Sequence, residues 1–249
     1  MIKLDKHYVD PRLVDLYDIE NPRGADTDFY LNLTKEIKAH KIIDLGCGTG
    51  LLTCEFAEAG HEVTGVDPAA AMLSVAKQKP AADKITWIEG TASAIGQSDA
   101  DLLTMTGNVA QIFLDDSDWL STLKAIYAAL KPGGYLAFES RNPLARGWEQ
   151  WNKNDSYFEY ESPHGLMKTW VEVVNVSDER VKFEGHNVFA STGEVIVVDS
   201  ELRFRSYQEL TQSLRKAGFS VDHVYGNWDK TVFEESSRTM IFVAKRDES

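Results

Sequence analysis

A run of glycines at every second position, directly after a short apolar segment, constrains this chain more than any other feature. Residues 42–45 have the pattern of a buried strand, and Gly46, Gly48 and Gly50 follow them. Glycine has no Cβ and tolerates positive φ, so such a loop lets a ligand approach the bare main chain. A helix is expected from Leu51, with its first, unpaired N–H groups pointing at the polar atoms of that ligand. The pattern predicts a nucleotide-like ligand at this turn.

The spacing of the glycines separates two kinds of nucleotide site. Dinucleotide-binding loops follow G-x-G-x-x-G, in which the third glycine lets the helix pack closely on the strand. Here the spacing is G-x-G-x-G, Leu51 stands where that pattern needs its last small residue, and Asp44 lies in the strand just before the first glycine. A nicotinamide-dependent oxidoreductase is therefore the less favoured interpretation, and it stays open as an alternative.

A second carboxylate ends the next predicted strand, residues 61–67. An acidic residue at this point of a strand–helix–strand unit can accept hydrogen bonds from two ribose hydroxyls, and Asp67 has that position. Because Pro68 follows, Asp67 could instead cap the next helix. One side chain can serve both roles, and the order of strand, glycine loop, helix, strand and Asp favours ribose binding.

Three segments of the chain resemble the class I S-adenosylmethionine-dependent methyltransferases. Residues 43–50 are similar to the first motif of that family, residues 65–68 to the second, and residues 131–136 to the turn that leads into its fifth strand. The resemblance implies an α/β fold with a doubly wound, mostly parallel, seven-stranded Rossmann-like sheet. It also implies S-adenosylmethionine as the cofactor and S-adenosylhomocysteine as the product. The cofactor-binding residues that it implies are Asp44, Gly46, Cys47, Gly48, Gly50, Asp67, Pro68, Met72, Thr91, Ala92, Ser93, Thr106, Gly107, Asn108 and Tyr17.

The chain departs from patterns seen among these enzymes at two places. The family commonly has an Asp after the glycine that follows its third strand, and this chain has Thr91 there, so backbone groups of Ala92 and Ser93 are expected to help read the adenine. Residues 106–109 lack the Asn or Asp, two prolines and aromatic of methyltransferases that act on planar nitrogens. Cys47 is expected to offer its backbone rather than a nucleophilic thiol, although a helix N-terminus lowers a thiol pKa.

Composition limits the partners of a chain of 249 residues. Its formal net charge of −13 argues against a nucleic-acid surface, because phosphate binding needs clustered Lys and Arg. The N-terminus lacks the apolar core of a signal peptide, and no apolar run is long enough to cross a bilayer, so a cytoplasmic protein without membrane contact is expected. Two cysteines, Cys47 and Cys54, cannot form a disulfide framework or a conventional zinc site, and no metal is expected.

The alternation of predicted strands and helices stops between residues 144 and 205, where only strands are predicted. We expect this region to form an inserted antiparallel sheet. Strands are predicted at 166–176, 181–189 and 194–205, whereas residues 1–143 and 206–249 form the Rossmann-like domain. The insertion is expected to lie over the active-site mouth and to shape the acceptor pocket. A small core or a homodimer face is an equally weighted alternative. The side chains concerned are Trp148, Trp151, Tyr157, Phe158, Tyr160, His164, Trp170 and His186.

Methyl transfer from a sulfonium needs orientation more than acid–base chemistry, so the sequence predicts no catalytic residue. A general base is required only if the acceptor arrives protonated. Asp229, in the loop 226–229, is a candidate base that is more often a turn residue. Acidic charge and aromatic residues fit a small neutral or cationic acceptor, such as an amine or hydroxyl of a metabolite. A non-catalytic cofactor sensor with the inserted sheet as its interface remains the other alternative.

Overall fold

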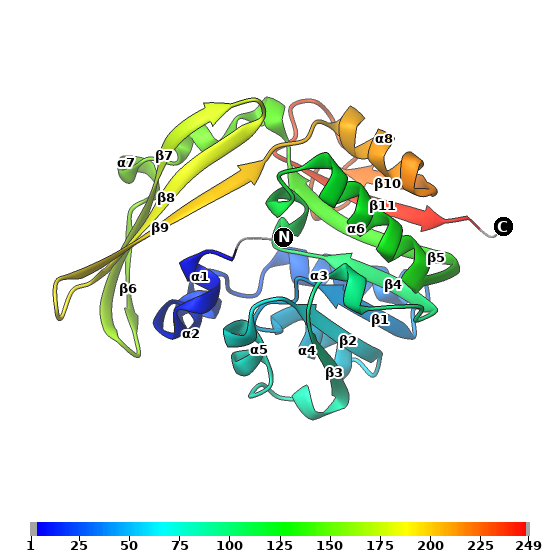
Figure 1. The fold of residues 1–249 in the computed structure, drawn as a ribbon, viewed down its shortest axis with the longest axis horizontal. Coiled ribbons are helices and arrows are strands. Elements are labelled where there is room, and N and C mark those ends of the chain that lie inside the picture. The colour runs from blue at the N-terminus through cyan, green and yellow to red at the C-terminus, as the bar shows by residue number, and fades with distance from the viewer. Residues whose placement is uncertain (1–3, 248–249) are drawn as a thin grey trace.

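The computed structural model describes residues 4–247, which form two β-sheets (Figure 1). The large sheet has seven strands in the order β10-β11-β5-β4-β1-β2-β3, and the small sheet has four in the order β6-β7-β8-β9. The strands of the large sheet are β1 (Lys41–Leu45), β2 (Glu62–Asp67), β3 (Ile85–Glu89), β4 (Ala100–Met105), β5 (Leu130–Arg141), β10 (Phe219–Tyr225) and β11 (Thr239–Arg246). Those of the small sheet are β6 (Phe158–Ser162), β7 (Gly165–Ser177), β8 (Arg180–Phe189) and β9 (Glu194–Arg203).

The large sheet is parallel except for β11, which runs antiparallel between β5 and β10. This arrangement confirms the predicted doubly wound α/β fold. The chain passes from β1 to β2 and β3 on one side, and β4 then pairs with the other side of β1. Ligands of such sheets bind beyond the carboxyl ends of the strands where the strand order reverses. That point lies between β1 and β4, beside the glycine loop.

Helices cover both faces of the large sheet because successive residues of its strands point to opposite sides. Ile42 packs with α3 (Ala25–Glu36) and α4 (Leu51–Glu58), whereas Ile43 packs with α6 (Asp116–Ala129) and α8 (Tyr207–Ala217). The pair Leu102 and Leu103 in β4 divides in the same way. These continuous apolar strands explain why the large sheet could be predicted from local sequence.

The small sheet has one strand more than the sequence predicted. Strand β6 pairs antiparallel with β7 along its whole length, and β9 ends at Arg203 rather than at Arg205. Three of the five residues of β6 are exposed, and aromatic residues alternate with Glu159 and Glu161. An edge strand with so little burial has a weak apolar signal, which is why the prediction of three strands was wrong.

Helices α1 (Lys6–Val9) and α2 (Pro11–Glu20) lie between the small sheet and α5 (Ala70–Ala76) (Figure 1). Leu13 and Leu16 of α2 are buried in a cluster with Met167, Phe189 and Ile196 of the small sheet. The hydroxyl of Tyr160 donates a 2.6 Å hydrogen bond to Glu20, and Arg12 forms an ion pair with Glu194. The N-terminal helices are therefore attached to the small sheet as well as to the glycine-loop side of the large one. The buried residues of α2 are Leu13, Val14 and Leu16.

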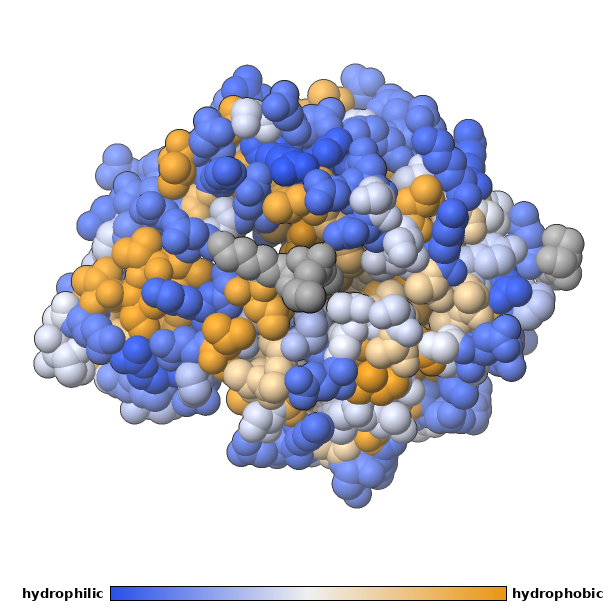
Figure 2. All heavy atoms as spheres, in the orientation of Figure 1, coloured by the Kyte–Doolittle hydropathy of each residue, from blue (hydrophilic) through white to orange (hydrophobic). Residues whose placement is uncertain are grey.

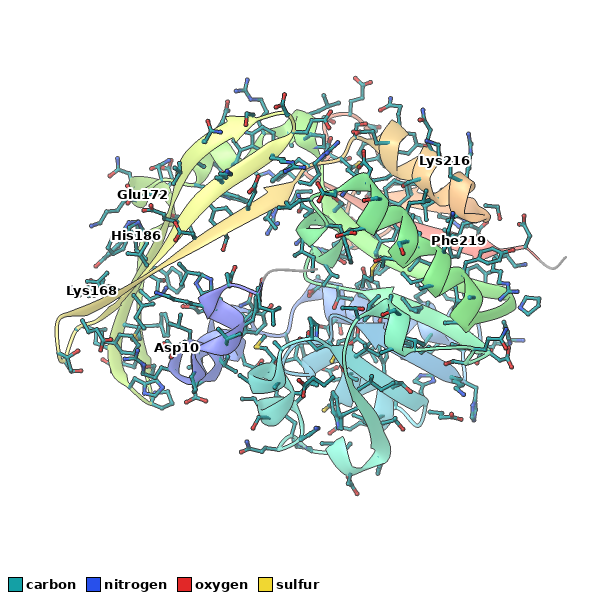
Figure 3. All side chains as sticks on the ribbon, in the orientation of Figure 1. Asp10, Lys168, Glu172, His186, Lys216 and Phe219 are labelled. Atoms are coloured by element: carbon teal, nitrogen blue, oxygen red, sulfur yellow. The ribbon has the colours of Figure 1, made fainter. Side chains whose placement is uncertain are left out.

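Aromatic residues of the insertion lie on both sides of the small sheet. Trp151 packs edge-on against Phe183, at 4.8 Å between ring centroids. Trp170 stacks on His186 at 4.6 Å, and His186 lies with Glu172 on the face that points away from α1 and α2 (Figure 3). Trp170 and His186 therefore do not line a pocket under the sheet. Exposed apolar residues, among them Val195 and Val197, also occur on β9, and Figure 2 shows apolar atoms gathered over this part of a largely hydrophilic surface.

Candidate functional site

Two glycines of the loop after β1 are required by the packing of the chain itself. Gly46 has a φ of 75°, and a Cβ added there would lie 2.6 Å from Cγ2 of Val109. Gly50 has a φ of 74°, and its Cβ would lie 2.7 Å from the ring of Trp87. Real Cβ contacts are longer than this, so larger residues would force the loop away from its neighbours.

The middle glycine faces the side chains that the N-terminal helix and α5 bring to the loop. Gly48 has a φ of 53°, and its added Cβ would lie 3.3 Å from Cε of Met72 and 3.9 Å from the ring of Tyr17. Met72 is 1% exposed, and Tyr17 packs beside it in the same cluster. The structure thus brings three of the predicted cofactor residues, Gly48, Met72 and Tyr17, together.

Asp67 ends β2 and holds the glycine loop. Its Oδ2 accepts a 2.9 Å hydrogen bond from the backbone N–H of Gly48, and its Oδ1 accepts a 2.8 Å bond from that of Ala69. Helix α5 begins at Ala70, with Ala69 as its N-cap, so Asp67 closes the preceding turn and is not the capping residue. Burial raises the pKa of its carboxyl group. A carboxylate has about four acceptor positions, so two remain for ribose hydroxyls.

Asp44 lies beneath the loop rather than in front of it. Its two oxygens accept hydrogen bonds from the hydroxyls of Thr53, at 2.7 Å, and Thr104, at 2.9 Å. The residue is 1% exposed, and burial raises the pKa of its carboxyl group to about 6. Asp44 therefore joins β1 to α4 and β4, the elements on either side of the loop.

An unpredicted contact fastens helix α2 to the glycine loop. Thr49, which is 2% exposed, donates a 2.5 Å hydrogen bond to Oδ1 of Asp18, and Lys79 lies 2.5 Å from Oδ2 of the same residue. Asp18 is thus shared by the loop after β1 and the segment after α5. It places the adjacent Tyr17 beside Gly48, and nothing in the local sequence around Asp18 signals this role.

The predicted adenine-side residues follow β3. The Thr91 and Ser93 hydroxyl oxygens are 3.0 Å apart, and Ala92 between them is 5% exposed. Both hydroxyls remain at the carboxyl end of the strand, on the same edge of the sheet as Asp67 and the half-buried Pro68. Hydroxyl groups can both donate and accept hydrogen bonds, so Thr91 and Ser93 can bind a ligand atom that is a donor or one that is an acceptor.

Cys47 is buried in the loop, where its backbone N–H donates to Val66. Burial raises the pKa of its thiol, and the nearby carboxylates of Asp44 and Asp67 act in the same direction. The expected lowering by the helix N-terminus is therefore outweighed. A thiol that stays protonated is a poor nucleophile, which agrees with a backbone role for Cys47.

The loop after β4 rests on a glutamate that the sequence analysis missed. The backbone N–H of Asn108 donates a 2.6 Å hydrogen bond to Oε1 of Glu139, and the hydroxyl of Tyr30 donates to Oε2. Asn108 and Gly107 both have positive φ, 62° and 72°. Glu139 is 4% exposed, and burial raises the pKa of its carboxyl group to about 7. The sequence signal that could have revealed Glu139 is a single acidic residue in an otherwise mostly apolar segment, the buried part of β5 that begins at Leu136.

Two residues farther along β5, Arg141 was also missed. Its Nη1 donates a 3.0 Å hydrogen bond to the side-chain oxygen of Gln111, which is fully buried, and its guanidinium lies 5.5 Å from the ring centre of Trp151. Burial lowers the pKa of Arg141, which still leaves a guanidinium charged. Among residues 4–247, no carboxylate lies within the 4.0 Å that defines an ion pair. The acid whose charge acts most on Arg141 is Glu139.

The loop after β10 does not supply a base. Asp229 accepts hydrogen bonds from the backbone and hydroxyl of Thr231, which lower the pKa of its carboxyl group. Trp228 packs against Phe29 and Tyr30 of α3, at 5.7 and 6.1 Å between ring centroids. The loop is therefore part of the packing around α3, and Asp229 has the turn contacts that the sequence analysis favoured.

Known methyltransferases match this chain in sequence and in fold. Residues 42–134 match a family model described as a methyltransferase domain. A protein of Geobacillus sp. strain WCH70 that is named as a methyltransferase is 28% identical over 225 residues, which cover 84% of this chain and 85% of that protein. The cypemycin N-terminal methyltransferase of Streptomyces is 22% identical over 97% of this chain and 99% of its own length.

The fold is shared with a solved S-adenosylmethionine-dependent methyltransferase from Clostridium acetobutylicum ATCC 824. The TM-score is 0.76 at 17% identity, over 95% of this chain and 98% of that one. The motifs and the sequence matches, together with the shared strand order, make the chain similar to the class I S-adenosylmethionine-dependent methyltransferases, with the methyltransferase domain at residues 42–134. Its cofactor is S-adenosylmethionine, and the residues around the glycine loop suit that cofactor because they present carboxylates to a cationic, ribose-containing molecule.

None of the helices between residues 4 and 247 is long and apolar enough to span a membrane. Over the same residues, no group of three or more His, Cys, Asp or Glu side chains has an arrangement suited to a metal ion.

Proposed function

We propose that this protein transfers the methyl group of S-adenosylmethionine to a small acceptor that carries an anionic group, such as a carboxylate, on Arg141. The observation that carries the proposal is a half-buried guanidinium with one hydrogen-bonded side chain and no ion pair among the described residues. Withdrawing an unpaired charge even partly from water costs free energy, so a partner from outside the chain is expected. A planar guanidinium binds a carboxylate through two parallel hydrogen bonds.

The position of Arg141 suits an acceptor rather than the cofactor. It ends β5, whereas the glycine loop and Asp67 follow β1 and β2. Gln111 fixes the guanidinium from one side, and Trp151, from the segment that leads into the small sheet, covers it with an aromatic ring. From the sequence we expected an amine or hydroxyl as the methyl-accepting group. The proposal adds an anionic group, since one small molecule can carry an amine or hydroxyl together with a carboxylate. The glycine/sarcosine N-methyltransferase of Halorhodospira halochloris, 24% identical over 94% of this chain, is named for acceptors of this kind.

In this proposal, the cofactor residues are those expected from the sequence. Gly46, Gly48 and Gly50 allow close approach to the main chain, and Asp67 binds the ribose while it holds Gly48. When bound, the cofactor supplies a methyl group already activated on a sulfonium. The loop 106–108 and Arg141 then orient the nucleophile toward it, because fixed geometry contributes most of the rate enhancement in such a displacement.

The test offers small amines and alcohols in pairs, each as the free carboxylate and as its amide, and measures release of S-adenosylhomocysteine. We expect kcat/KM to be about 10 to 100 times higher for the carboxylates, the value of one or two charge-assisted hydrogen bonds. In Arg141→Gln this preference should fall close to one, while S-adenosylmethionine is still bound at pH 8. Equal turnover of acids and amides by the wild type would overturn the anionic acceptor.

The matched control is Arg146→Gln. Arg146 is exposed, pairs only with Glu149 three residues later among the described residues, and should leave the acid preference unchanged. Calorimetric titration with NADH tests the oxidoreductase alternative, which would require NADH to bind and S-adenosylmethionine to fail. Tight cofactor binding with no turnover of any acceptor would favour the non-catalytic sensor instead.

A further inference from the structure

Three buried carboxylates stand at or near the carboxyl ends of strands in the large sheet. Asp67 ends β2, Asp44 precedes the last residue of β1, and Glu139 lies two residues before the end of β5. They are 7%, 1% and 4% exposed. Among residues 4–247 none of them forms an ion pair within 4.0 Å. The site therefore holds three buried carboxylates without a paired cation among the described residues, and Arg141 is the cation whose charge acts on Glu139.

The three carboxylates differ in what holds them. Asp44 is bonded on both oxygens to threonine hydroxyls beneath the loop, and Asp67 is bonded to the backbone of the glycine loop. Glu139 is the one that contacts the loop 106–108, through the N–H of Asn108. That loop follows β4 at the reversal of strand order, where the methyl group of the cofactor is expected. Glu139 is thus the carboxylate on the methyl side.

We propose that Glu139 gives the site its preference for the sulfonium cofactor over the thioether product. The inference rests on the proposed function, because it places the cofactor sulfur beside the loop 106–108. The two ligands share the ribose, the adenine and the amino-acid group, and they differ in one methyl group and one positive charge at sulfur. A negative charge held close to that sulfur favours the cation, and the attraction disappears once the methyl group has left.

Charges on the elements around Glu139 determine when it is ionised. Tyr30 of α3 donates its hydroxyl to the carboxylate and lowers its pKa, Asp26 of the same helix raises it, and Arg141 of β5 lowers it. Burial is the largest effect and brings the pKa to about 7. The neutral acid can still accept from Asn108, so protonation removes the charge without removing the contact. The preference for the sulfonium should therefore rise between about pH 6 and pH 8.

The experiment compares S-adenosylmethionine and S-adenosylhomocysteine by calorimetric titration of the full chain at pH 6.0 and pH 8.0. For the wild type we expect the ratio of the two affinities to move toward S-adenosylmethionine by about tenfold at the higher pH, the size of a single charge interaction across a protein interior. Glu139→Gln reproduces the shape of the neutral acid, so its ratio should be the same at both pH values. A wild-type ratio independent of pH would overturn the proposal.

Two variants separate the charge of Glu139 from its structural contacts. Tyr30→Phe removes the hydrogen bond that lowers the pKa of Glu139, so the pH at which the preference appears should rise while the preference at high pH is retained. Glu62→Gln removes an exposed carboxylate at the opposite end of β2, where Lys41 pairs with it, and should behave as the wild type. If Glu139→Gln keeps the pH dependence, or if Glu62→Gln loses it, Glu139 is not its source.

The outcomes also separate this proposal from the proposed function. Failure of both ligands to bind the wild type would contradict the proposed function itself. Binding of both with a constant ratio would contradict only the role of Glu139. Circular dichroism shows whether Glu139→Gln folds. If it does not, Tyr30→Phe still tests the proposal. An unchanged midpoint, in that variant, of the rise with pH in the preference for S-adenosylmethionine would overturn it.

Discussion

The backbone N–H of Gly48 donates a 2.9 Å hydrogen bond to the carboxylate of Asp67, which joins the loop after β1 to the end of β2. The same carboxylate accepts from Ala69 at the start of the turn into α5. Asp67 therefore shapes the glycine loop before any ligand binds. Two acceptor positions of the carboxylate remain for the expected ribose.

Asp67→Ala should abolish detectable cofactor binding. The substitution removes the acceptor for two ribose hydroxyls and leaves the N–H of Gly48 without its partner, for a combined loss of at least about 100-fold in affinity. Calorimetry with S-adenosylmethionine measures the change, and circular dichroism checks the fold. The matched control is Asp222→Ala, an exposed acid on β10 paired with His223. A Kd within a factor of three of the wild-type value would contradict ribose binding by Asp67.

Gly46→Ala should destabilise the fold more than Gly60→Ala. Both glycines have positive φ, 75° and 92°, so both variants incur the cost of that backbone conformation, about 1–2 kcal/mol. Only at Gly46 would the new Cβ overlap a neighbour, Val109, whereas nothing lies within 4 Å at Gly60. The overlap should lower the free energy of unfolding by about 1–3 kcal/mol more. Urea denaturation of both variants gives the comparison, and equal losses would show that Val109 moves aside freely.

Glu139→Gln should stabilise the protein at pH 8 and have little effect at pH 5. The pKa of Glu139 is about 7 in the folded chain against an ordinary value of 4.5, so the folded state binds more protons between these values. Stability contributed by this group therefore falls as pH rises from about 4.5 to 7, by up to about 3 kcal/mol. Glutamine avoids this loss. Thermal unfolding at the two pH values tests the sign, and a variant that is less stable than wild type at pH 8 would contradict it.

Asp18→Ala should loosen α2 from the glycine loop. Thr49 would lose its acceptor and Lys79 its ion pair, and an unsatisfied buried hydroxyl costs about 1–3 kcal/mol. Amide hydrogen exchange should become faster in residues 11–20 while residues 207–217 of α8 keep their protection. Cofactor affinity should fall several-fold, since Tyr17 is no longer held beside Gly48. Unchanged exchange in α2 would mean that the small sheet alone holds the helix.

Local sequence determined the part of the protein that depends on neighbouring residues. Apolar pairs such as Ile42 and Ile43 predict strands buried on both faces, and the spacing of the glycines predicts a loop open to a ligand. Asp67 could be found because it ends a strand at a fixed place in the strand–loop–helix–strand order. These signals depend on backbone conformation and burial within a few residues, which is why they can be recognised without the fold.

Tertiary structure alone decided the contacts between distant segments. Tyr30 and Glu139 are 109 residues apart in sequence, and Thr49 and Asp18 are 31 apart, yet both pairs are joined by hydrogen bonds. The absence of an ion pair at Arg141 within residues 4–247 likewise depends on how β5, Gln111 and Trp151 come together. Burial, hydrogen bonding and the pKa of a side chain depend on whatever the complete fold places around it. Sequence thus determined the fold and the cofactor loop, whereas packing decided which charges face the reacting groups.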